Sequence, residues 1–580
     1  MRLPTFVNPR TRLTTSSSRS FSEAPSSGSS DGLLHKNTII NSLSENFILK
    51  HSSSSSFYPE NEFTGPLGLF LGNSTNHHLM GLTTQSFFLL TFVFFLVNVL
   101  RPQRKELRSI PTVKATLPWL PSIFGALLYA FRAEEITQRG YEQYRGCIFK
   151  IPQITRWQVV VTGRKFIEEL RKADDEDLSF VEAVNENFQL DYTIGPEINA
   201  KPFHIAVVRG HLTRNIGTII PKVLDEIQLA FQDIIPPHRG WTSVSAHDAV
   251  LEIVCRTVNR IFVGEPLCRN HDFGALNIGF TMDVAIGGTI LGLFPSFLRP
   301  FLVPWLTNVP KSIERGIKHL KPIIEERYRM MEDHNDPEWE DRPNDLLMWL
   351  MDEVDEENRT VPALVRRILT LNFAAVHTTT MSFMYALYRL AAQPTYVDVL
   401  REEIEPIVES RGWDKDAIES MTKLDSFLRE CQRFYGLGNL TMFRKAMKDF
   451  AFSDGTVVPS GTFVAAPELP LHHDEEFYGC PNIFNPWRFS DKTLLPPTTL
   501  TEGKFQFVTT SPEYLAFGHG KNACPGRFFA AVVLKCMISH MILHYDLRME
   551  HEGIVPEPVW YGDRMMPNPK ANVMFRRRET

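Results

Sequence analysis

An uncharged, mostly apolar stretch covers residues 80–100, and four cations follow it between residues 101 and 108. About 20 apolar residues form a helix long enough to cross a bilayer. Cations directly after such a stretch keep the chain that follows in the cytosol, by the positive-inside rule. The pattern therefore predicts a single-pass transmembrane helix at residues 80–100. A buried core helix is the alternative.

Residues 1–79 are rich in serine and show no hydrophobic period. Such a segment cannot bury enough apolar area to offset its ordering entropy, so we expect a disordered tail. Arginines without acids before Glu23 are also typical of a mitochondrial transit peptide, which is an alternative for this end of the chain. Asn73 begins a glycosylation sequon in the tail. Four prolines between residues 102 and 121 predict a stiff hinge over residues 101–125.

From residue 126 to residue 580 the pattern is mostly helical and has no internal repeat. The apolar segment from Leu364 to Ala392 predicts one long helix. Short β-branched runs such as Trp157–Val161 predict strands. We therefore expect one large domain over residues 126–580, mainly α with small β-sheets.

Composition narrows the class of protein. A chain of 580 residues with 43% hydrophobic content can bury a large core. A net charge of −6 is slight for this length and argues against a nucleic-acid partner. The seven cysteines have no paired spacing, which suits a reducing compartment and excludes a disulfide framework or a zinc pattern.

The chemistry concentrates in residues 517–526, which read FGHGKNACPG. Gly518 and Gly520 allow positive φ angles and close approach of the backbone. Cys524 lies just before a predicted helix, whose N-terminal N–H groups favour a thiolate. The loop therefore predicts Cys524 as the thiolate ligand of a metal cofactor, with Phe517 packed under a flat macrocycle. A glycine turn with an ordinary buried cysteine is the alternative.

This loop resembles the heme-binding loop of the cytochrome P-450 superfamily, and the likeness continues through Arg527–Ala530. The resemblance covers residues 101–577 and implies the P-450 fold with heme b, whose iron has Cys524 as its proximal thiolate ligand. Most members have Arg or His two residues before the cysteine, directed at a heme propionate. Here that residue is Asn522, which donates a hydrogen bond without a charge.

The resemblance also assigns a buried charge triad. Glu430 and Arg433 are three residues apart, so they share a helix face, although surface pairs at this spacing are common. Arg488 lies in a segment similar to the second arginine motif of the family. The resemblance implies that Glu430 is shared between two bidentate guanidinium groups and braces the heme-side core.

The centre of the predicted 364–392 helix crosses the distal face of the heme in the family. Ala374 and Ala375 match the two small residues that leave room for dioxygen. Thr378 matches a threonine whose hydroxyl bends the helix and holds a water. His377 stands where the family generally has Asp or Glu. It is either a proton shuttle or a neutral histidine hydrogen-bonded in a polar kink, and both remain open.

Further arginines are assigned by position in the family pattern. Arg444 matches a propionate-binding arginine. Arg209 and Arg214 lie in the heme-facing helix, and Arg214 is preferred; solvated surface arginines are the alternative. Lys521 and Arg527 flank the thiolate loop and predict a cationic docking face. Because the chain has no flavin or nicotinamide fingerprint, electrons must come from a separate NADPH-cytochrome P-450 reductase.

Together these features predict a monooxygenase of the endoplasmic reticulum membrane, with its catalytic domain in the cytosol and in contact with membrane lipid. It uses dioxygen to hydroxylate or further oxidise a lipophilic small molecule. Asp191–Gly195 and Arg260–Gly264 resemble the ent-kaurene-oxidase-like fungal group, which implies a terpenoid in secondary metabolite biosynthesis. A peroxide-rearranging enzyme of the same fold, which needs no reductase, and a heme carrier or sensor are the alternatives. The predicted pocket residues are Phe373, Leu437, Leu440 and Thr441.

Overall fold

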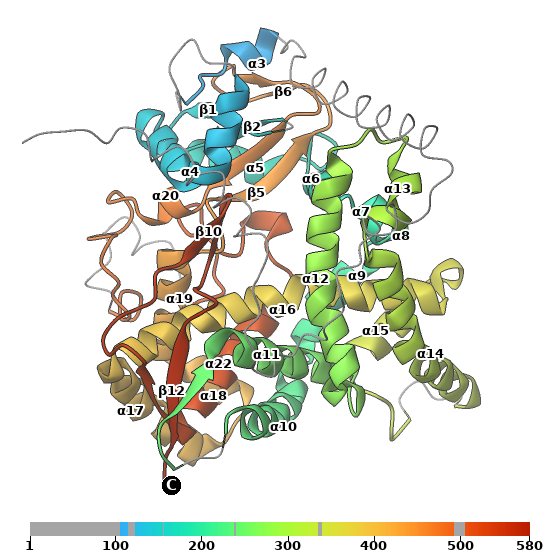
Figure 1. The fold of residues 1–580 in the computed structure, drawn as a ribbon, viewed down its shortest axis with the longest axis vertical. Coiled ribbons are helices and arrows are strands. Elements are labelled where there is room, and N and C mark those ends of the chain that lie inside the picture. The colour runs from blue at the N-terminus through green and yellow to red at the C-terminus, as the bar shows by residue number, and fades with distance from the viewer. Residues whose placement is uncertain are drawn as a thin grey trace, which may run out of the picture. The chain divides into compact units, whose positions relative to one another are not determined.

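The structure is a computed structural model (Figure 1), and the residues it describes lie in one compact unit. The predicted tail, the predicted span at residues 80–100 and the sequon at Asn73 fall outside the described residues. The described ranges are 105–113, 122–154, 156–236, 239–334, 339–491 and 505–579.

The unit is mainly helical, as predicted. Its shorter helices are α3 (Lys105–Ser109), α5 (Arg164–Lys172), α6 (Phe180–Phe188), α7 (Leu190–Thr193), α8 (Glu197–Ala200), α9 (Phe203–Val207), η2 (Val208–Leu212), η3 (Leu267–Arg269), α13 (Arg299–Leu306), α15 (Leu346–Glu353), η4 (Glu356–Asn358), α18 (Lys415–Ser420), α20 (Leu469–His472) and η6 (Gly520–Asn522). The longer ones are α4 (Ser122–Gln143), α10 (Ile216–Ile234), α11 (Ala246–Phe262), α12 (His271–Gly292), α14 (Val309–Asp333), α16 (Val361–Ala392), α17 (Pro394–Arg411), α19 (Thr422–Tyr435) and α22 (Arg527–His544).

The strands form four small sheets. The largest has the order β1-β2-β8-β5-β3, in which β2 and β8 are parallel and the other neighbours antiparallel. A second sheet has the order β4-β12-β9, and β10-β11 and β6-β7 are two-stranded. The strands are β1 (Ile148–Pro152), β2 (Trp157–Val161), β3 (Leu178–Ser179), β4 (Thr242–Ser245), β5 (Leu440–Ala446), β6 (Phe450–Ala451), β7 (Val457–Val458), β8 (Phe463–Pro467), β9 (Tyr545–Met549), β10 (Val559–Tyr561), β11 (Arg564–Met566) and β12 (Asn572–Arg577).

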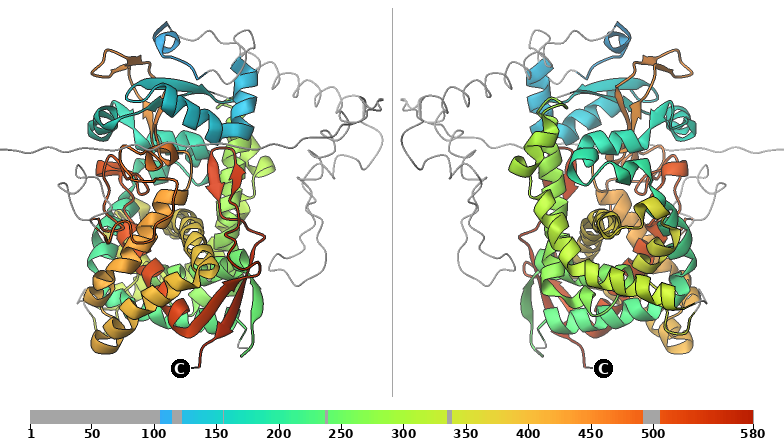
Figure 2. Two further views of the ribbon diagram at one scale, coloured as in Figure 1. Left: turned by 90° about the vertical axis from the view of Figure 1, so that its left-hand side faces the viewer. Right: turned by 90° about the vertical axis from the view of Figure 1, so that its right-hand side faces the viewer.

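The long helix α16 confirms the prediction for residues 364–392. Its first turn is capped by Thr360, whose side chain accepts a hydrogen bond from Ala363 N. It ends before Pro394, which cannot continue its hydrogen-bonding pattern and instead starts α17. Figure 2 shows α16, in yellow, nearly end-on and enclosed by the other elements. Most of its side chains are buried, so α16 is a core helix of the unit.

Helix α22 follows Cys524 directly and is also buried over most of its length. It is one of two described helices, with α12, that are long and apolar enough to cross a membrane. A core helix passes the same test, and neither helix lies in the predicted span at residues 80–100. The span therefore stays a prediction.

Part of the predicted hinge contacts the catalytic unit. Ile110 and Val113 are buried, and Thr112 forms a parallel β-bridge with Lys150. The ammonium group of Lys150 donates a hydrogen bond to Ile110 O at 2.8 Å. Residues 110–113 are thus fixed on the edge of β1.

Candidate active site

The loop before α22 is closed by its own backbone. Cys524 N donates to Phe517 O at 2.8 Å, and Ala523 N donates to Gly520 O at 3.1 Å. Gly520 has φ +80°, and a Cβ at this position would lie 2.3 Å from Arg171 Cγ. Only glycine meets both conditions, since a larger residue would be strained and would push the loop off α5.

The environment of the Cys524 thiol differs from the sequence argument in one respect. Burial raises the pKa of this thiol, whereas the N–H groups of Gly526 and Arg527 and the charge of Arg527 lower it. The net shift is upward, so the helix N-terminus does not ionise the thiol by itself. Coordination to a metal cation deprotonates a thiol outright. The side chain of Cys524 is nevertheless accessible, which leaves the sulfur free to act as a ligand.

The centre of α16 carries two accessible positions on an otherwise buried helix. Ala374 and Thr378 are exposed and are one turn apart, so they share a face. Thr378 Oγ1 donates to Ala374 O at 2.8 Å, the back-bond expected from the sequence. Ala374 and Thr378 thus present a small side chain and a hydroxyl group on one accessible face of α16.

His377 points away from that face. Its Nε2 lies 3.0 Å from Ile278 O on α12, and because a carbonyl only accepts, Nε2 carries the hydrogen. Burial lowers the pKa of His377, which favours the neutral ring. This geometry is that of the hydrogen-bonded neutral histidine. A relay would have to use Nδ1, and the relay role stays a prediction.

Glu430, Arg433 and Arg488 meet in the core between α19 and the segment before residue 491. The carboxylate of Glu430 is fully buried. Arg433 binds it with two hydrogen bonds, Nε to Oε2 at 2.7 Å and Nη2 to Oε1 at 2.9 Å. Arg488 Nε reaches Oε2 at 3.0 Å. Asn485 N adds a fourth bond at 2.9 Å, so both oxygens are satisfied.

The prediction that both arginines bind Glu430 in a bidentate manner is wrong. Arg433 is bidentate, but Arg488 contributes a single hydrogen bond to Glu430. Its other nitrogens donate to Gly479 O at 2.6 Å and Ile483 O at 2.8 Å. Arg488 therefore links the loop 479–488 to the carboxylate of Glu430. Because the other N–H groups of Arg488 bind carbonyls of this loop, they are not available for a second hydrogen bond to Glu430.

Arg444 on β5 is a buried guanidinium without a carboxylate partner among the described residues. It is 2% exposed; Nη1 donates to Phe443 O at 2.8 Å, and Nε has no partner in the same part of the chain. Burial lowers the pKa of Arg444 to about 10. A buried cation with an unsatisfied N–H is costly unless an anion pairs with it. The donor set fits a heme propionate.

Replacing Arg444 by alanine is expected to weaken heme retention by about 10- to 100-fold, the equivalent of one or two charge-assisted hydrogen bonds. The measurement is the rate at which purified holoprotein transfers heme to an excess of a heme acceptor. Lys445→Ala is the matched control, because side chains alternate along β5 and Lys445 pairs with Glu186 instead. Equal transfer rates for the two variants would remove Arg444 from the cofactor site.

Asn522 and Phe517 belong to the loop itself, whereas Arg209 lies in η2 and Arg214 follows that helix. Arg209 Nη2 donates to Lys521 O at 3.0 Å, whereas Arg214 is exposed. Asn522 Nδ2 lies 3.5 Å from Asp175 Oδ1. The propionate roles of Arg214 and Asn522 stay predictions. Phe517 packs edge-on against Phe507, with ring centroids 5.2 Å apart.

A hollow of about 270 Å³ opens beside the thiolate loop. It is cationic, as predicted for this face, because it includes three basic side chains, and Lys521 and Arg527 are two of them. Its lining residues are Arg209, Thr213, Gly520, Lys521, Ala523, Pro525, Arg527 and Phe528.

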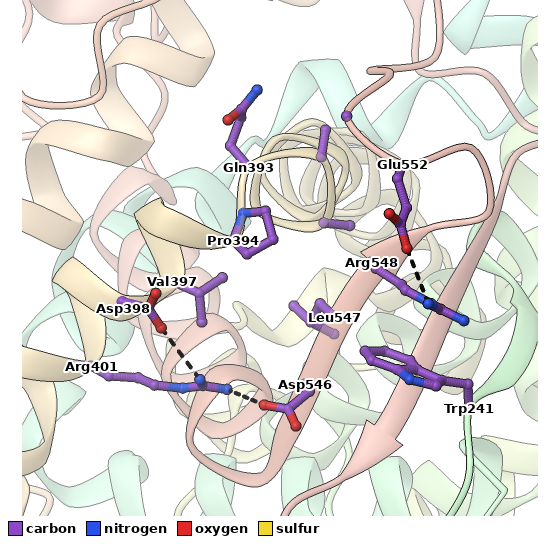
Figure 3. Close-up of a pocket in the computed structure, with 13 residues that line it drawn as sticks. Trp241, Gln393, Pro394, Val397, Asp398, Arg401, Asp546, Leu547, Arg548 and Glu552 are labelled. Atoms are coloured by element: carbon purple, nitrogen blue, oxygen red, sulfur yellow. Dashed lines mark hydrogen bonds and ion pairs between the residues drawn. The ribbon is translucent and has the colours of Figure 1, made fainter.

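A larger cavity of about 650 Å³ lies elsewhere, between α17 and β9 (Figure 3). Figure 3 shows Arg401 between Asp398 and Asp546, at 3.8 Å and 3.1 Å. Arg548 pairs with Glu552 at 3.0 Å. The charges in this cavity are paired with one another, and neither Cys524 nor Thr378 lines it.

The sequence argument missed Arg429, which precedes Glu430. This buried guanidinium donates to Gln506 O at 2.5 Å and to Thr509 O at 2.8 Å, and it lies 3.8 Å from the ring centre of Tyr514. It thereby anchors the chain that leads into the cysteine loop. The sequence signal was a second cation directly beside the triad glutamate.

A helical unit with a cysteine loop before a core helix, a buried charge triad and a long central helix defines a heme-thiolate protein. The cytochrome P450 family model matches residues 116–575. The chain belongs to this family, whose members bind heme through a cysteine thiolate and act as monooxygenases.

Relatives and a solved structure agree with this assignment. Cytochrome P450 monooxygenase 151 of Postia placenta is 41% identical and covers 82% of this chain and 95% of its own. Cytochrome P450 monooxygenase CYP512U6 of Ganoderma lucidum is 34% identical over 84% of this chain and 95% of its own. A retinoic acid bound cyanobacterial CYP120A1 has a TM-score of 0.59 at 20% identity, over 81% of this chain and 99% of its own, which shows the fold.

Proposed function

We propose that this chain is a membrane-anchored monooxygenase that hydroxylates or further oxidises a lipophilic terpenoid in fungal secondary metabolism. The observation that carries the proposal is the accessible pair of Ala374 and Thr378 on a buried helix, together with an accessible Cys524. Oxygen activation at a heme requires three things of the protein: a small side chain, a hydroxyl group and a thiolate ligand.

Each residue of the proposed site has a role that follows from the chemistry of its side chain. Heme bound through a thiolate supplies dioxygen binding and O–O cleavage. Cys524 is the proposed iron ligand, and Arg444 the proposed propionate partner. Thr378 holds a hydroxyl at the accessible face of α16, where it can pass a proton to the reacting oxygen. The small side chain of Ala374 leaves room for dioxygen on the same face.

An apolar substrate suits the side chains assigned to the pocket. Phe373 packs edge-on against Phe188 with ring centroids 5.1 Å apart, and Leu440 is buried. Pockets lined in this way favour lipophilic ligands. The cyanobacterial structure that shares this fold is bound to retinoic acid.

An aromatic stripe on α13 and the loop before it supports attachment to the endoplasmic reticulum membrane. Phe297, Phe301 and Trp305 are spaced by four and are 70%, 73% and 67% exposed. Exposed aromatic residues in register are typical of a helix that lies at a membrane interface. The stripe would hold the cytosolic catalytic unit on the bilayer that the 80–100 span crosses.

The cationic hollow beside the thiolate loop supports a separate NADPH-cytochrome P-450 reductase as electron donor. Arg209, Lys521 and Arg527 all line this hollow, and Arg209 Nη2 donates a hydrogen bond to Lys521 O. An acidic docking surface would be steered to these charges, so reduction should slow as salt is added.

The test is turnover in membranes that contain the chain, with and without an NADPH-cytochrome P-450 reductase, on a panel of cyclic terpenoids. We expect oxygenated product only with reductase, NADPH and dioxygen together. Thr378→Val keeps the shape and removes the hydroxyl. It should lower product per NADPH by at least about tenfold, because proton delivery is worth that much or more.

His377→Ala run in parallel decides between the two roles of the histidine, since a relay predicts the same loss of coupling as Thr378→Val. Product formed from a lipid hydroperoxide without reductase would instead favour the peroxide-rearranging alternative. Unchanged coupling in Thr378→Val would contradict the assigned role of the hydroxyl.

A further inference from the structure

A buried acid lies under the turn that joins α19 to β5. Glu468 follows β8 directly and is 4% exposed. Among the described residues, no cation lies within ion-pair distance of its carboxyl group, and Oε1 has no hydrogen-bond partner there. An acid in this setting needs either a partner or a proton.

The turn 436–439 wraps round this carboxyl group. Gly436 has φ +63°, and a Cβ at this position would lie 3.0 Å from Glu468 Oε1 and 3.8 Å from Gly438 O. The N–H group of Leu437 lowers the pKa of the carboxyl group, which burial raises. The carboxyl group therefore occupies the inside of the turn, where a side chain on residue 436 would otherwise lie.

The backbone of the same turn connects three elements. Glu468 N donates to Asn439 O at 2.8 Å, and Asn439 N donates to Asp563 O at 2.9 Å, next to the β10–β11 hairpin. Leu440 then pairs with Pro467, and Thr441 with Ala466, as β5 begins. A shift of the turn would therefore move the start of β5, which carries Leu440 and Thr441.

The charges around Glu468 leave it protonated at neutral pH. Burial raises its pKa to about 8, and the exposed guanidinium of Arg564 on β11 and the Leu437 N–H lower it only in part. Tyr514 is the other titratable group whose pKa responds to Glu468, and it is itself buried. The uncharged acid keeps a donor and an acceptor inside the turn.

We propose that Glu468, through the turn 436–439, is a positioning residue that sets where Leu437 and Leu440 meet the substrate. It touches neither the substrate nor the cofactor. The inference rests on the proposed function, which assigns residues 437–441 to the pocket. Loss of the proton places an unpaired charge inside the turn, so the pocket wall loosens as the pH rises through 8.

The test compares two heme ligands on the membrane-bound holoprotein. Imidazole binds iron and needs little of the pocket, whereas 1-phenylimidazole also requires apolar contacts with the wall. From about pH 7 to about pH 9, the affinity of the natural chain for 1-phenylimidazole should fall about tenfold relative to imidazole, because one pH unit above its pKa about a tenth of the acid keeps its proton.

Two variants separate positioning from packing. Glu468→Gln keeps the shape and both hydrogen-bonding functions without titrating, so it should bind 1-phenylimidazole as the natural chain does at pH 7 and show no fall at pH 9. Glu468→Ala should lose about tenfold at pH 7 through the unfilled turn. Glu475→Gln, an exposed acid on the same segment, should follow the natural chain throughout.

Each contrary result has its own meaning. The same alkaline fall in Glu468→Gln as in the natural chain would overturn the role of Glu468 and leave the pocket assignment standing. If 1-phenylimidazole binds the natural chain no tighter than imidazole, the pocket assignment itself fails. Should Glu468→Ala not retain heme, the pH profile of Glu468→Gln decides alone.

Discussion

Arg433→Ala is expected to accumulate as apoprotein of low stability. The substitution removes both hydrogen bonds of the bidentate pair and leaves the fully buried Glu430 with one arginine and one backbone N–H. Breaking a buried ion pair in this way costs about 3–5 kcal/mol. That is a large share of the 5–15 kcal/mol by which domains are typically stable. Arg433 also donates to His472 O at 2.6 Å, so one of the hydrogen bonds between α19 and α20 is lost as well.

The measurements are the heme content of purified protein, its reduced carbon-monoxide spectrum and its thermal unfolding. Arg329→Ala is the matched control, because Arg329 pairs with Glu326 at the same i, i+3 spacing on an exposed face of α14. Its loss should cost less than about 1 kcal/mol. Normal heme incorporation by Arg433→Ala would refute the triad.

The elements that the sequence predicted well are those whose causes are local. The 364–392 helix depends on its own apolar length and on Pro394 at its end, and α16 matches it within three residues. The glycines of the cysteine loop encode their own φ angles, so Gly518 and Gly520 both have positive φ. The strand at Trp157–Val161 likewise follows from its β-branched run.

The features that the sequence did not predict depend on partners far along the chain. His377 faces the carbonyl of Ile278, which is 99 residues away in the sequence, and no local sequence pattern predicts that contact. Arg488 is monodentate because carbonyls of its own loop take its donors. Burial outweighs the helix N-terminus in setting the pKa of Cys524, and burial is a property of the folded unit.

Glu468 depends both on local sequence and on a partner far along the chain. Its sequence neighbours place it after a strand, which is local information. That its carboxyl group lies inside a turn formed 30 residues earlier follows only from the antiparallel pairing of β5 with β8. A single acid in an apolar segment is thus a sequence signal for a buried polar site, whereas its partner requires the structure.

Cys524→Ser is expected to have the largest effect of any single change. A serine hydroxyl has nearly the volume of the thiol, so the loop should keep its backbone bonds from Phe517 O and Gly520 O. The pKa of the serine hydroxyl is far higher than that of a thiol, so heme iron would not deprotonate it as it does a thiol. The substitution also removes the electron-rich sulfur ligand. NADPH-dependent product formation should fall by more than about 100-fold, beyond what loss of an outer partner of a ligand costs.

The readouts are the reduced carbon-monoxide spectrum, which reports thiolate ligation, and turnover with the reductase. Cys147→Ser is the control, since Cys147 is also accessible but lies directly before β1, and both readouts should stay normal. A thermal unfolding curve of Cys524→Ser near that of the natural apoprotein would show that the loss is chemical. Full pigment and full turnover in Cys524→Ser would move the iron ligand elsewhere and remove the basis of the proposed site.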